Sequence, residues 1–178
     1  TYYYYYTICE ILNPDNCDSG TAIIIVEPSI IEVVKDTLGN YNGKDGGVTT
    51  SVLQNDKLNG VVIDPSDIAL SYVPSIEGGK IMMQPDGTII IDSETQAGVY
   101  EYPYTICEKL NPGNCDSAVV TIVVEKSLIE AINDIYAINS KVGGATTSVL
   151  QNDKLNDVFL SPSHVDLSYD ASIADGKI

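Results

Sequence analysis

Two long segments of the chain occur twice, and this internal repeat constrains the fold more than any other feature. Residues 7–27 read TICEILNPDNCDSGTAIIIVE and return as residues 105–125, 98 positions later, with 14 of 21 residues identical. Residues 49–61, TTSVLQNDKLNGV, return as residues 146–158, 97 positions later. Self-similarity at a fixed period is the signature of a repeat architecture. The unit of about 98 residues has the size of a small β-sandwich.

The phase of the repeat divides the chain into three parts. When the boundary is placed after the apolar run ending in VVE, residues 1–27 are the C-terminal part of a preceding repeat, residues 28–125 are one complete repeat, and residues 126–178 are the N-terminal part of a following repeat. The two outer parts together would still lack a counterpart of residues 82–98, so they cannot complete one another. We therefore expect the chain to be a window on a longer tandem array.

The apolar residues favour an all-β fold, built from tandem β-sandwich repeats. Hydrophobic residues make up 44% of the chain, and most of them are Ile, Val and Tyr. These β-branched and aromatic side chains fit a pleated, half-buried surface. Such a composition also argues against disorder, in spite of the high charge.

The charge excludes two classes of partner. The formal net charge is -16, and all nine basic residues are Lys. A chain of this kind lacks the basic surface that neutralises nucleic-acid phosphates or attracts an anionic membrane. Its apolar runs are also far shorter than the roughly 20 residues that a membrane-spanning helix needs. We expect neither nucleic-acid binding nor direct membrane insertion.

Turn residues mark two hairpins in the complete repeat. Strands at residues 99–108 and 116–125 are joined by KLNPGN, whose Asn-Pro-Gly-Asn centre is typical of a turn. Residues 80–84 and 88–92 are joined across Pro-Asp-Gly, a second turn signal.

The remaining elements are less distinct. Residues 127–138 have apolar spacing that allows a helix, but the equivalent SIIEVVKDTL is richer in β-branched residues, so we predict a strand. Further strands are expected at residues 29–35, 61–63 and 68–73, with a Gly- and Asn-rich loop over residues 38–47.

The four cysteines lie on opposite sides of the repeated hairpin turn. Cys9 and Cys17 form one pair, and Cys107 and Cys115 the other, each with seven residues between. Two disulfides within the repeats are predicted, each contributing roughly 2.5 kcal/mol by loop closure. A thiolate metal site is the alternative, but two Cys per repeat and a single His164 cannot supply a tetrahedral N/S set. Disulfides imply an oxidising compartment outside the cytoplasm.

The tyrosine run at residues 2–6 follows the same repeat. Tyr2, Tyr4 and Tyr6 align with Tyr100, Tyr102 and Tyr104, an alternating set that faces one side of a strand. We expect this set to pack in the sandwich core. The alternative is a stacking platform for sugars, for which Tyr3 and Tyr5 on the opposite face would be the candidates in this copy only. Pro103 predicts an edge strand or a bulge, because proline cannot donate to a ladder.

Acidic residues recur around each proposed junction between repeats. Oxygen ligands from two neighbouring repeats would suit Ca²⁺, and a solvated acidic surface is the alternative. The spacing does not match an EF-hand loop. The recurring carboxylates are Glu27, Glu32, Asp36 and Asp56, which return as Glu125, Glu130, Asp134 and Asp153.

The sequence shows no catalytic pattern. A repeated triad would need His in both copies, yet the position of His164 is occupied by Asp67 in the other copy. Paired carboxylates occur in glycosidases, but here no nucleophile with a base accompanies them. We expect no enzyme activity and no cofactor other than the candidate Ca²⁺.

The order VLQND, QPDGTIII and Y-x-Y-x-YTICE resembles bacterial Ig-like and cadherin-like repeats. The segment YTICEKLNPGNCDSAVVTIVV is similar to repeats of giant cell-surface adhesins of Bacteroidota, including the gliding-motility adhesins of flavobacteria. The resemblance implies an extracellular filament, exported by type IX secretion and moved by the gliding machinery. Lys57 intrudes where many calcium-dependent relatives carry acidic residues. Thr37 and Ser117 lie in Asp-Thr/Ser-apolar triplets that resemble O-glycosylation acceptors of that phylum.

Two classes of function remain open. The first is a structural and adhesive array whose partners are neighbouring repeats, other fibres, surface polysaccharide or the gliding machinery. The second is a module that binds a specific carbohydrate or protein. The repeated features are mostly turns, core-like apolar positions and cysteines, which favours the array.

Overall fold

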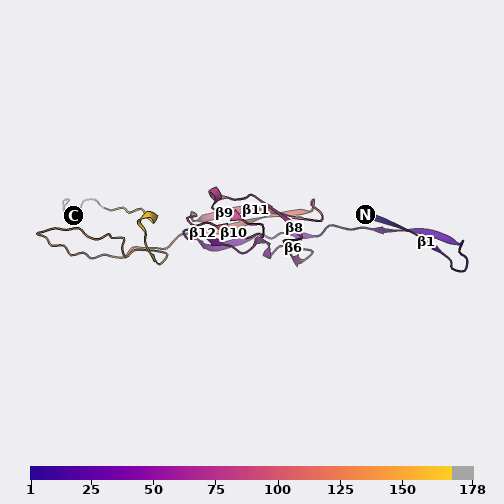
Figure 1. The fold of residues 1–178 in the computed structure, drawn as a ribbon, viewed down its shortest axis with the longest axis horizontal. Coiled ribbons are helices and arrows are strands. Elements are labelled where there is room, and N and C mark those ends of the chain that lie inside the picture. The colour runs from indigo at the N-terminus through magenta and orange to yellow at the C-terminus, as the bar shows by residue number, and fades with distance from the viewer. Residues whose placement is uncertain (170–178) are drawn as a thin grey trace.

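The computed structural model describes residues 1–169, in which the regular elements are strands and short 3-10 helices. The molecule is long and narrow, with a strand hairpin at one end, a layered body in the middle and a partial set of strands at the other end (Figure 1).

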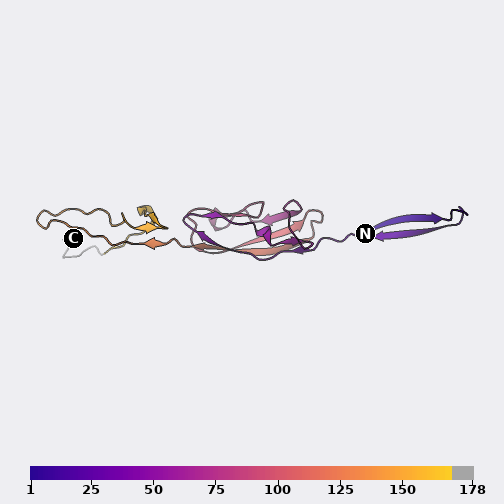
Figure 2. The same cartoon turned by 90° about the horizontal axis from the view of Figure 1, so that it is seen from below.

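The first region is a hairpin of β1 (Tyr2–Cys9) and β2 (Cys17–Ile24). Its antiparallel register runs from Tyr2 opposite Ile24 to Cys9 opposite Cys17. Every residue of β1 is exposed. Figure 2 shows the hairpin extending away from the body of the molecule.

The body is a sandwich of two sheets. One sheet has the order β4 (Thr37–Asn42), β12 (Cys115–Glu125), β11 (Gly98–Glu108) and β8 (Ile68–Tyr72). The other has the order β5 (Gly47–Val48), β10 (Ile89–Ile91) and β9 (Ile81–Met83). A third, small sheet has the order β3 (Ile31–Glu32), β6 (Lys57–Leu58) and β7 (Val61–Val62). Among these strands β4 alone runs parallel to its neighbour, β12.

The core fills the space between the two larger sheets, because strand alternation turns one set of side chains inward. In β11 the inward set includes Tyr102, Tyr104 and Ile106, and each is at most 2% exposed. Across the core they meet buried aliphatic side chains of the other sheet, and the inward residues of β12, beside β11 in the same sheet, belong to the same cluster. The prediction of an all-β sandwich is confirmed. Of the alternating tyrosines expected in its core, Tyr102 and Tyr104 are buried and Tyr100 packs against the same core, whereas the prediction is wrong for Tyr2, Tyr4 and Tyr6, which are exposed because no second sheet within residues 1–169 covers the first hairpin.

The two predicted hairpins are present. β11 and β12 pair from Gly98 opposite Val124 to Cys107 opposite Cys115. β9 and β10 pair across the Pro-Asp-Gly turn, where Gly87 has a φ of 79°. An added Cβ at Gly87 would lie 2.6 Å from the Ser51 hydroxyl, so both the backbone and the close approach require glycine.

Three strand predictions were wrong in detail. β4 (Thr37–Asn42) occupies the first half of residues 38–47, which were expected to form a loop, and it is held by long-range parallel pairing with β12 that includes a register shift. The predicted strand at residues 29–35 is reduced to Ile31–Glu32, and the one at residues 127–138 to β13 (Ile129–Glu130). Periodicity detects apolar spacing, but these lengths depend on which partner strand is available.

Pro103 lies where one edge of β11 is open. β8 pairs with β11 only from Tyr104 to Glu108, so Pro103 has a ladder partner, Val119 of β12, on one side alone. A proline is tolerated at such an edge because no second ladder is interrupted.

The third region repeats the small sheet of the body. β13 pairs with β14 (Lys154–Leu155), which pairs with β15 (Val158–Phe159). The register of Ile129 opposite Leu155 reproduces that of Ile31 opposite Leu58. A 3-10 helix, η3 (Pro162–His164), follows.

Candidate functional site

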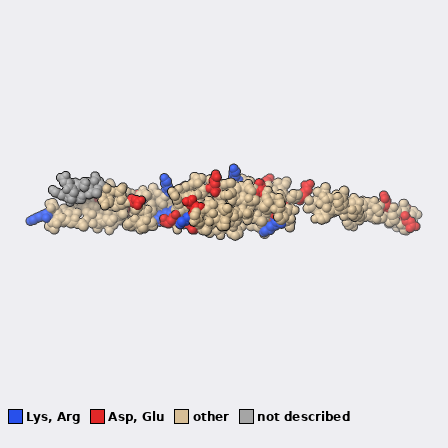
Figure 3. Space-filling view, turned by 90° about the horizontal axis from the view of Figure 1, so that it is seen from above, with Lys and Arg blue, Asp and Glu red and all other residues tan. Residues whose placement is uncertain are grey.

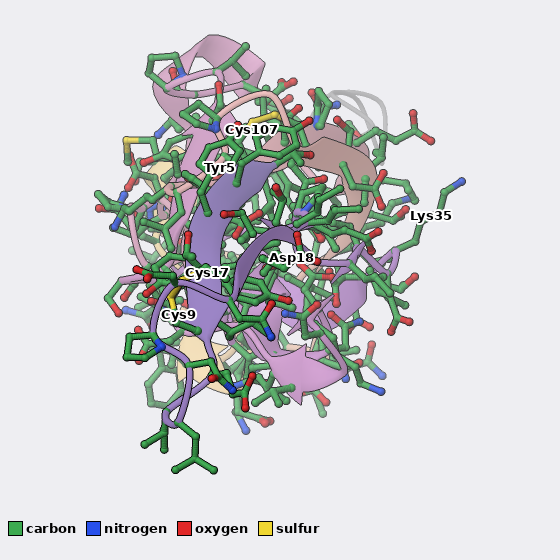
Figure 4. All side chains as sticks on the ribbon, turned by 90° about the vertical axis from the view of Figure 1, so that its right-hand side faces the viewer. Tyr5, Cys9, Cys17, Asp18, Lys35 and Cys107 are labelled. Carbon is green, nitrogen blue, oxygen red and sulfur yellow. A yellow bond between two sulfur atoms is a disulfide. The ribbon has the colours of Figure 1, made fainter. Side chains whose placement is uncertain are left out.

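The turn between β11 and β12 lies at one end of the complete repeat, beside Val26 and Pro28. A disulfide joins Cys107 to Cys115, directly opposite each other at a Cα–Cα distance of 4.1 Å. The first hairpin has the same bridge, Cys9 to Cys17, also at 4.1 Å. Figure 4 looks along the molecule from the side of the first hairpin and shows Cys9 beside Cys17, with Cys107 elsewhere in the view. Each bridge closes its turn at the base, so the tip is presented as a small constrained loop.

Within the tip of the second hairpin, Glu108 connects the turn to the beginning of the repeat. Its carboxylate accepts a hydrogen bond from Asn114 Nδ2 at 3.0 Å, and it also accepts from Ser29 Oγ at 2.9 Å and the Ser29 N–H at 3.2 Å. Hydrogen bonds from the side chains of Asn114 and Asn111, and then from Ser29, lower the pKa of Glu108 to about 2. The tip is thereby tied to the start of its own repeat.

The equivalent carboxylate of the first hairpin has fewer partners. Glu10 accepts from Asn16 at 2.9 Å and from Asn13 at 2.6 Å, and these two bonds lower its pKa. The hydrogen bonds within the tip therefore depend only on the local sequence E-x-x-N-x-x-N and form in both hairpins. The hydrogen bonds from Ser29 form only in the complete repeat.

A buried carboxylate lies at the centre of the body. Asp56 is fully buried; its Oδ1 accepts from the Val34 N–H at 2.8 Å, and its Oδ2 accepts from the Tyr104 hydroxyl at 3.2 Å. The same hydroxyl lies 3.3 Å from Asp36 Oδ2, and Asn55 donates to Asp36 Oδ1 at 2.9 Å. Burial, opposed in part by these hydrogen bonds, raises the pKa of Asp56 to about 6.

The structure assigns roles to residues of the repeated segment Val-Leu-Gln-Asn-Asp (residues 52–56). Val52 and Leu53 bury their side chains in the η1 turn (Val52–Gln54), and the following Asp56 joins residues 34–36 to the tyrosine strand. In the third region, Asp153 repeats the first part of the arrangement, because its Oδ1 accepts from the Ile132 N–H at 2.7 Å.

The structure brings two of the candidate calcium ligands together, Asp36 and Asp56, through their shared contact with Tyr104. Within residues 1–169, no group of three or more His, Cys, Asp or Glu side chains is placed to hold a metal ion. Calcium therefore remains a sequence prediction without geometric support. Of the other candidates, Asp153 is buried, Glu130 and Asp134 are half-buried, and Glu27, Glu32 and Glu125 are exposed.

The two candidate glycosylation residues lie on strands of the same sheet. Thr37 is the first residue of β4 and is exposed. Ser117, on β12, is exposed, but its hydroxyl shares a 2.8 Å hydrogen bond with the hydroxyl of Thr105. The structure places both at the surface, and their modification stays a prediction.

Polar contacts join the body to the third region. Asn156 Nδ2 donates to Asp45 Oδ2 at 3.1 Å, and Asn42 Nδ2 donates to Asn156 Oδ1 at 3.3 Å. The same Oδ1 accepts from the Leu128 N–H at 2.9 Å, as Asn59 Oδ1 accepts from the Ile30 N–H in the body. Asn156 and Asn59 both adopt positive φ, which Asn tolerates well.

This asparagine joint was missed by the sequence reasoning. Its signal was the repeated Leu-Asn of residues 58–59 and 155–156, at the turn between two short strands. A repeated Asn in a tight turn first indicates a backbone requirement, and its side-chain contact with a neighbouring repeat depends on packing between units.

A hollow of about 450 Å³ lies beside this joint, and we refer to it as the junction hollow. Its walls come from the end of the body and from the start of the third region. The lining residues are Gly43, Lys44, Glu94, Thr95, Gln96, Ala97, Glu125, Lys126, Ser127, Ile129, Leu155 and His164.

Charge is distributed along the molecule. On the face shown in Figure 3, the carboxylates lie mainly over the body and the first hairpin, and the lysines lie over the body and at the opposite end of the molecule. The one ion pair within residues 1–169 joins neighbours in the sequence, Lys44 and Asp45, at 3.6 Å. An acidic surface of this kind opposes nonspecific association.

No family model matches the chain, and no curated protein matches it. Solved structures give distant likenesses. A SusE-like surface-located polysaccharide-binding protein of the Bacteroides thetaiotaomicron heparin utilisation locus is 15% identical, with a TM-score of 0.38 over 55% of this chain and 15% of that one. The third cadherin domain of human protocadherin 7 is 10% identical, with a TM-score of 0.40 over 59% of this chain and 92% of the domain.

A two-domain structure of human protocadherin-24 is 16% identical, with a TM-score of 0.37 over 70% of this chain and 67% of that one. The chain spans less than a sixth of the SusE-like protein. Likenesses at these TM-scores carry no functional argument. In the part of the chain that the structure describes, no helix is long and apolar enough to cross a membrane.

Proposed function

We propose that this chain is a segment of a tandem array of β-sandwich repeats, in which residues 28–125 form one repeat and the regions on either side belong to its neighbours. The observation that carries the proposal is the double occurrence of one hairpin. Tyr102 and Tyr104 are buried in the body, whereas their counterparts Tyr4 and Tyr6 are 65% and 46% exposed in the first hairpin. The first hairpin thus has the alternating tyrosines of a core strand, but no other strands cover them in the described part of the chain.

The array serves as a structural and adhesive element of a secreted surface filament. Two disulfides favour an oxidising location outside the cytoplasm. Small sandwiches joined by short contacts form quasi-one-dimensional arrays, whose length is set by the number of units. Attachment to a surface is the role that we propose for this filament. Gliding motility with type IX export is the specific setting that we propose for it.

The first test is the mass and length of the native protein. A tandem array predicts a mature mass far above 19.1 kDa, and filaments with one regular axial step per repeat in electron micrographs. A mature mass near 19.1 kDa would contradict the proposal. Deletion of the encoding gene should abolish surface attachment and gliding, and retained gliding would remove the motility setting while leaving the array intact.

A carbohydrate-binding module is the second candidate, favoured by one observation. Tyr3 and Tyr5 are 59% and 75% exposed on the first hairpin, as a stacking platform requires. Their counterparts in the body are Glu101 and Pro103, so the platform is not repeated. Binding of the chain to a glycan array that is lost in the double variant Tyr3→Ala, Tyr5→Ala would support this candidate over the spacer.

A further inference from the structure

The tip of the disulfide hairpin carries an exposed leucine in both copies. Leu110 is 88% exposed and Leu12 is 87% exposed. The turn that holds each leucine is constrained by the disulfide and by the asparagine–glutamate bonds described above. A single exposed leucine is ordinary on a protein surface, so a partner must be argued from its surroundings.

Within the body, the tip lies against the front of its own repeat. Ser29, Leu58 and Asp67 line one hollow together with Glu108, Lys109 and Leu110. The Lys109 N–H donates to the Asp67 carbonyl at 3.0 Å, and Lys109 Nζ donates to the Ser66 carbonyl at 2.6 Å. The position of the tip relative to these front residues is therefore defined by hydrogen bonds.

The same front residues occur in the third region, and they line the junction hollow. Ser127, Leu155 and His164 are the counterparts of Ser29, Leu58 and Asp67. By equivalence with the body, the counterpart of residues 108–110 in the following repeat belongs in this hollow. The opposite wall is the end of the body, formed by residues 43–44 and 94–97.

The boundary on the other side of the body has the same geometry. Val26, at the end of the first region, and Pro28, at the start of the body, line a hollow with residues 110–114 of the tip. The counterpart of Pro28 is Lys126, which lines the junction hollow. At this boundary a hairpin tip therefore lies beside the residues that follow β2 of the preceding repeat, and the junction hollow offers the equivalent position to the tip of the following repeat.

We infer that the Leu-Asn-Pro tip of each repeat docks on the end of the preceding repeat, against the wall formed by residues 43–44 and 94–97. The partner is a second copy of the same repeat, adjacent in the chain, so the inference rests on the proposed tandem array. The disulfide hairpin then has two roles: its strands complete one sandwich, and its tip contacts the previous one. Together with the asparagine joint, this second contact restricts bending between repeats.

The test extends the chain after Ile178 by a copy of residues 82–125, which supplies the strands that the following repeat lacks. Gln96 lines the junction hollow and is exposed. The variant Gln96→Cys should react with iodoacetamide about tenfold more slowly in the extended chain than in the 178-residue chain, because access then requires local opening. The matched control is Glu101→Cys, exposed on β11, whose rate should be equal in both chains.

A second variant tests the leucine. Leu→Asp at the counterpart of Leu110 in the added segment should restore the fast labelling of Gln96→Cys, with the added disulfide still formed. If hydrogen exchange shows that the added repeat is folded and Gln96→Cys is still labelled at the same rate in both chains, the inferred docking of the tip is overturned. The proposed array would be unaffected by that result. Failure of the added segment to fold onto residues 126–178 would instead overturn the division into repeats, on which the inferred docking of the tip rests.

Discussion

The hairpin of β1 and β2 and the hairpin of β11 and β12 share sequence, register and disulfide, yet only the second has a core to pack against. Cys9 lies opposite Cys17 as Cys107 lies opposite Cys115. Every residue of β1 is exposed, whereas the inward side chains of β11 are buried. The local sequence is thus sufficient for strand pairing and for the tip, whereas burial of the tyrosines depends on residues 28–98.

The largest expected difference between the hairpins concerns a tyrosine. Tyr102 is fully buried, donates a hydrogen bond to the Val73 carbonyl and accepts one from the Met83 N–H at 3.2 Å. Tyr102→Ala should lower the free energy of unfolding of the body by about 3 to 5 kcal/mol, as for other large-to-small core substitutions. Urea unfolding followed by near-UV circular dichroism measures the change.

The matched control is Tyr4→Ala at the equivalent position of the first hairpin. Tyr4 is 65% exposed, so the unfolding free energy of the body should change by less than about 0.5 kcal/mol. Equal effects of the two variants would mean that the first hairpin is packed in solution.

The next prediction concerns Asp56, a buried residue of the body for which the first hairpin has no equivalent position. Its pKa in the folded state, about 6, lies above the value of 3.8 that is usual for an aspartate in the unfolded chain, so the folded state binds the proton more tightly. The contribution of this group to stability is greatest below pH 3.8 and is lost as the pH rises through 6. From pH 4 to pH 7.5 the loss should be about 2 to 3 kcal/mol.

Asp56→Asn should remove this loss, because the amide stays neutral and its oxygen still accepts from the Val34 N–H. Chemical unfolding of both proteins between pH 4 and pH 7.5 measures the difference in slope. A matched variant is Asp18→Asn, an exposed strand residue of the first hairpin, which should leave the slope unchanged. Parallel pH profiles for Asp56→Asn and the unmodified chain would contradict the role assigned to burial.

A third prediction compares the two disulfides. The double substitution Cys107→Ser, Cys115→Ser should destabilise the body by about 2.5 kcal/mol, because it releases a loop of nine residues in the unfolded chain. Cys9→Ser, Cys17→Ser should leave unfolding of the body unchanged. Thermal unfolding under non-reducing conditions separates the two, and a shift of the body transition by the first pair would show that the hairpins are coupled.

These comparisons also show what the sequence could predict. The paired hairpin, its cysteines and the inward tyrosines follow from alternation and turn chemistry, which are local. β4 was missed because Gly39 and Asn40 indicate a loop, and the strand exists through pairing with β12 about 80 positions away. Asp56 was considered as a calcium ligand, but its role in binding Val34 and Tyr104 depends on contacts distant in the sequence.

The contacts between repeats were least accessible to prediction. Asn156 meets Asp45 across 111 positions, and a single sequence without the neighbouring fold does not indicate that pairing. The tip leucines are visible in the sequence, but the docking site that we infer for such a tip depends on the positions of Ser127, Leu155 and His164 in space.

The smallest expected effect concerns the carboxylates at the two tips. Both have lowered pKa values, but Glu108 has two bonds from Ser29 in addition to those from asparagine, so its pKa of about 2 should lie below that of Glu10. Because a lowered pKa favours the charged form, stability from Glu108 is present above its unfolded-state pKa near 4.5 and is lost as the pH falls through 2. Carboxyl carbon chemical shifts in an NMR titration resolve the two residues. Ser29→Ala should raise the pKa of Glu108 toward that of Glu10 and leave Glu10 unchanged, and identical titrations of Glu108 with and without the Ser29 hydroxyl would assign its low pKa to the asparagines of the tip and to the Ser29 N–H.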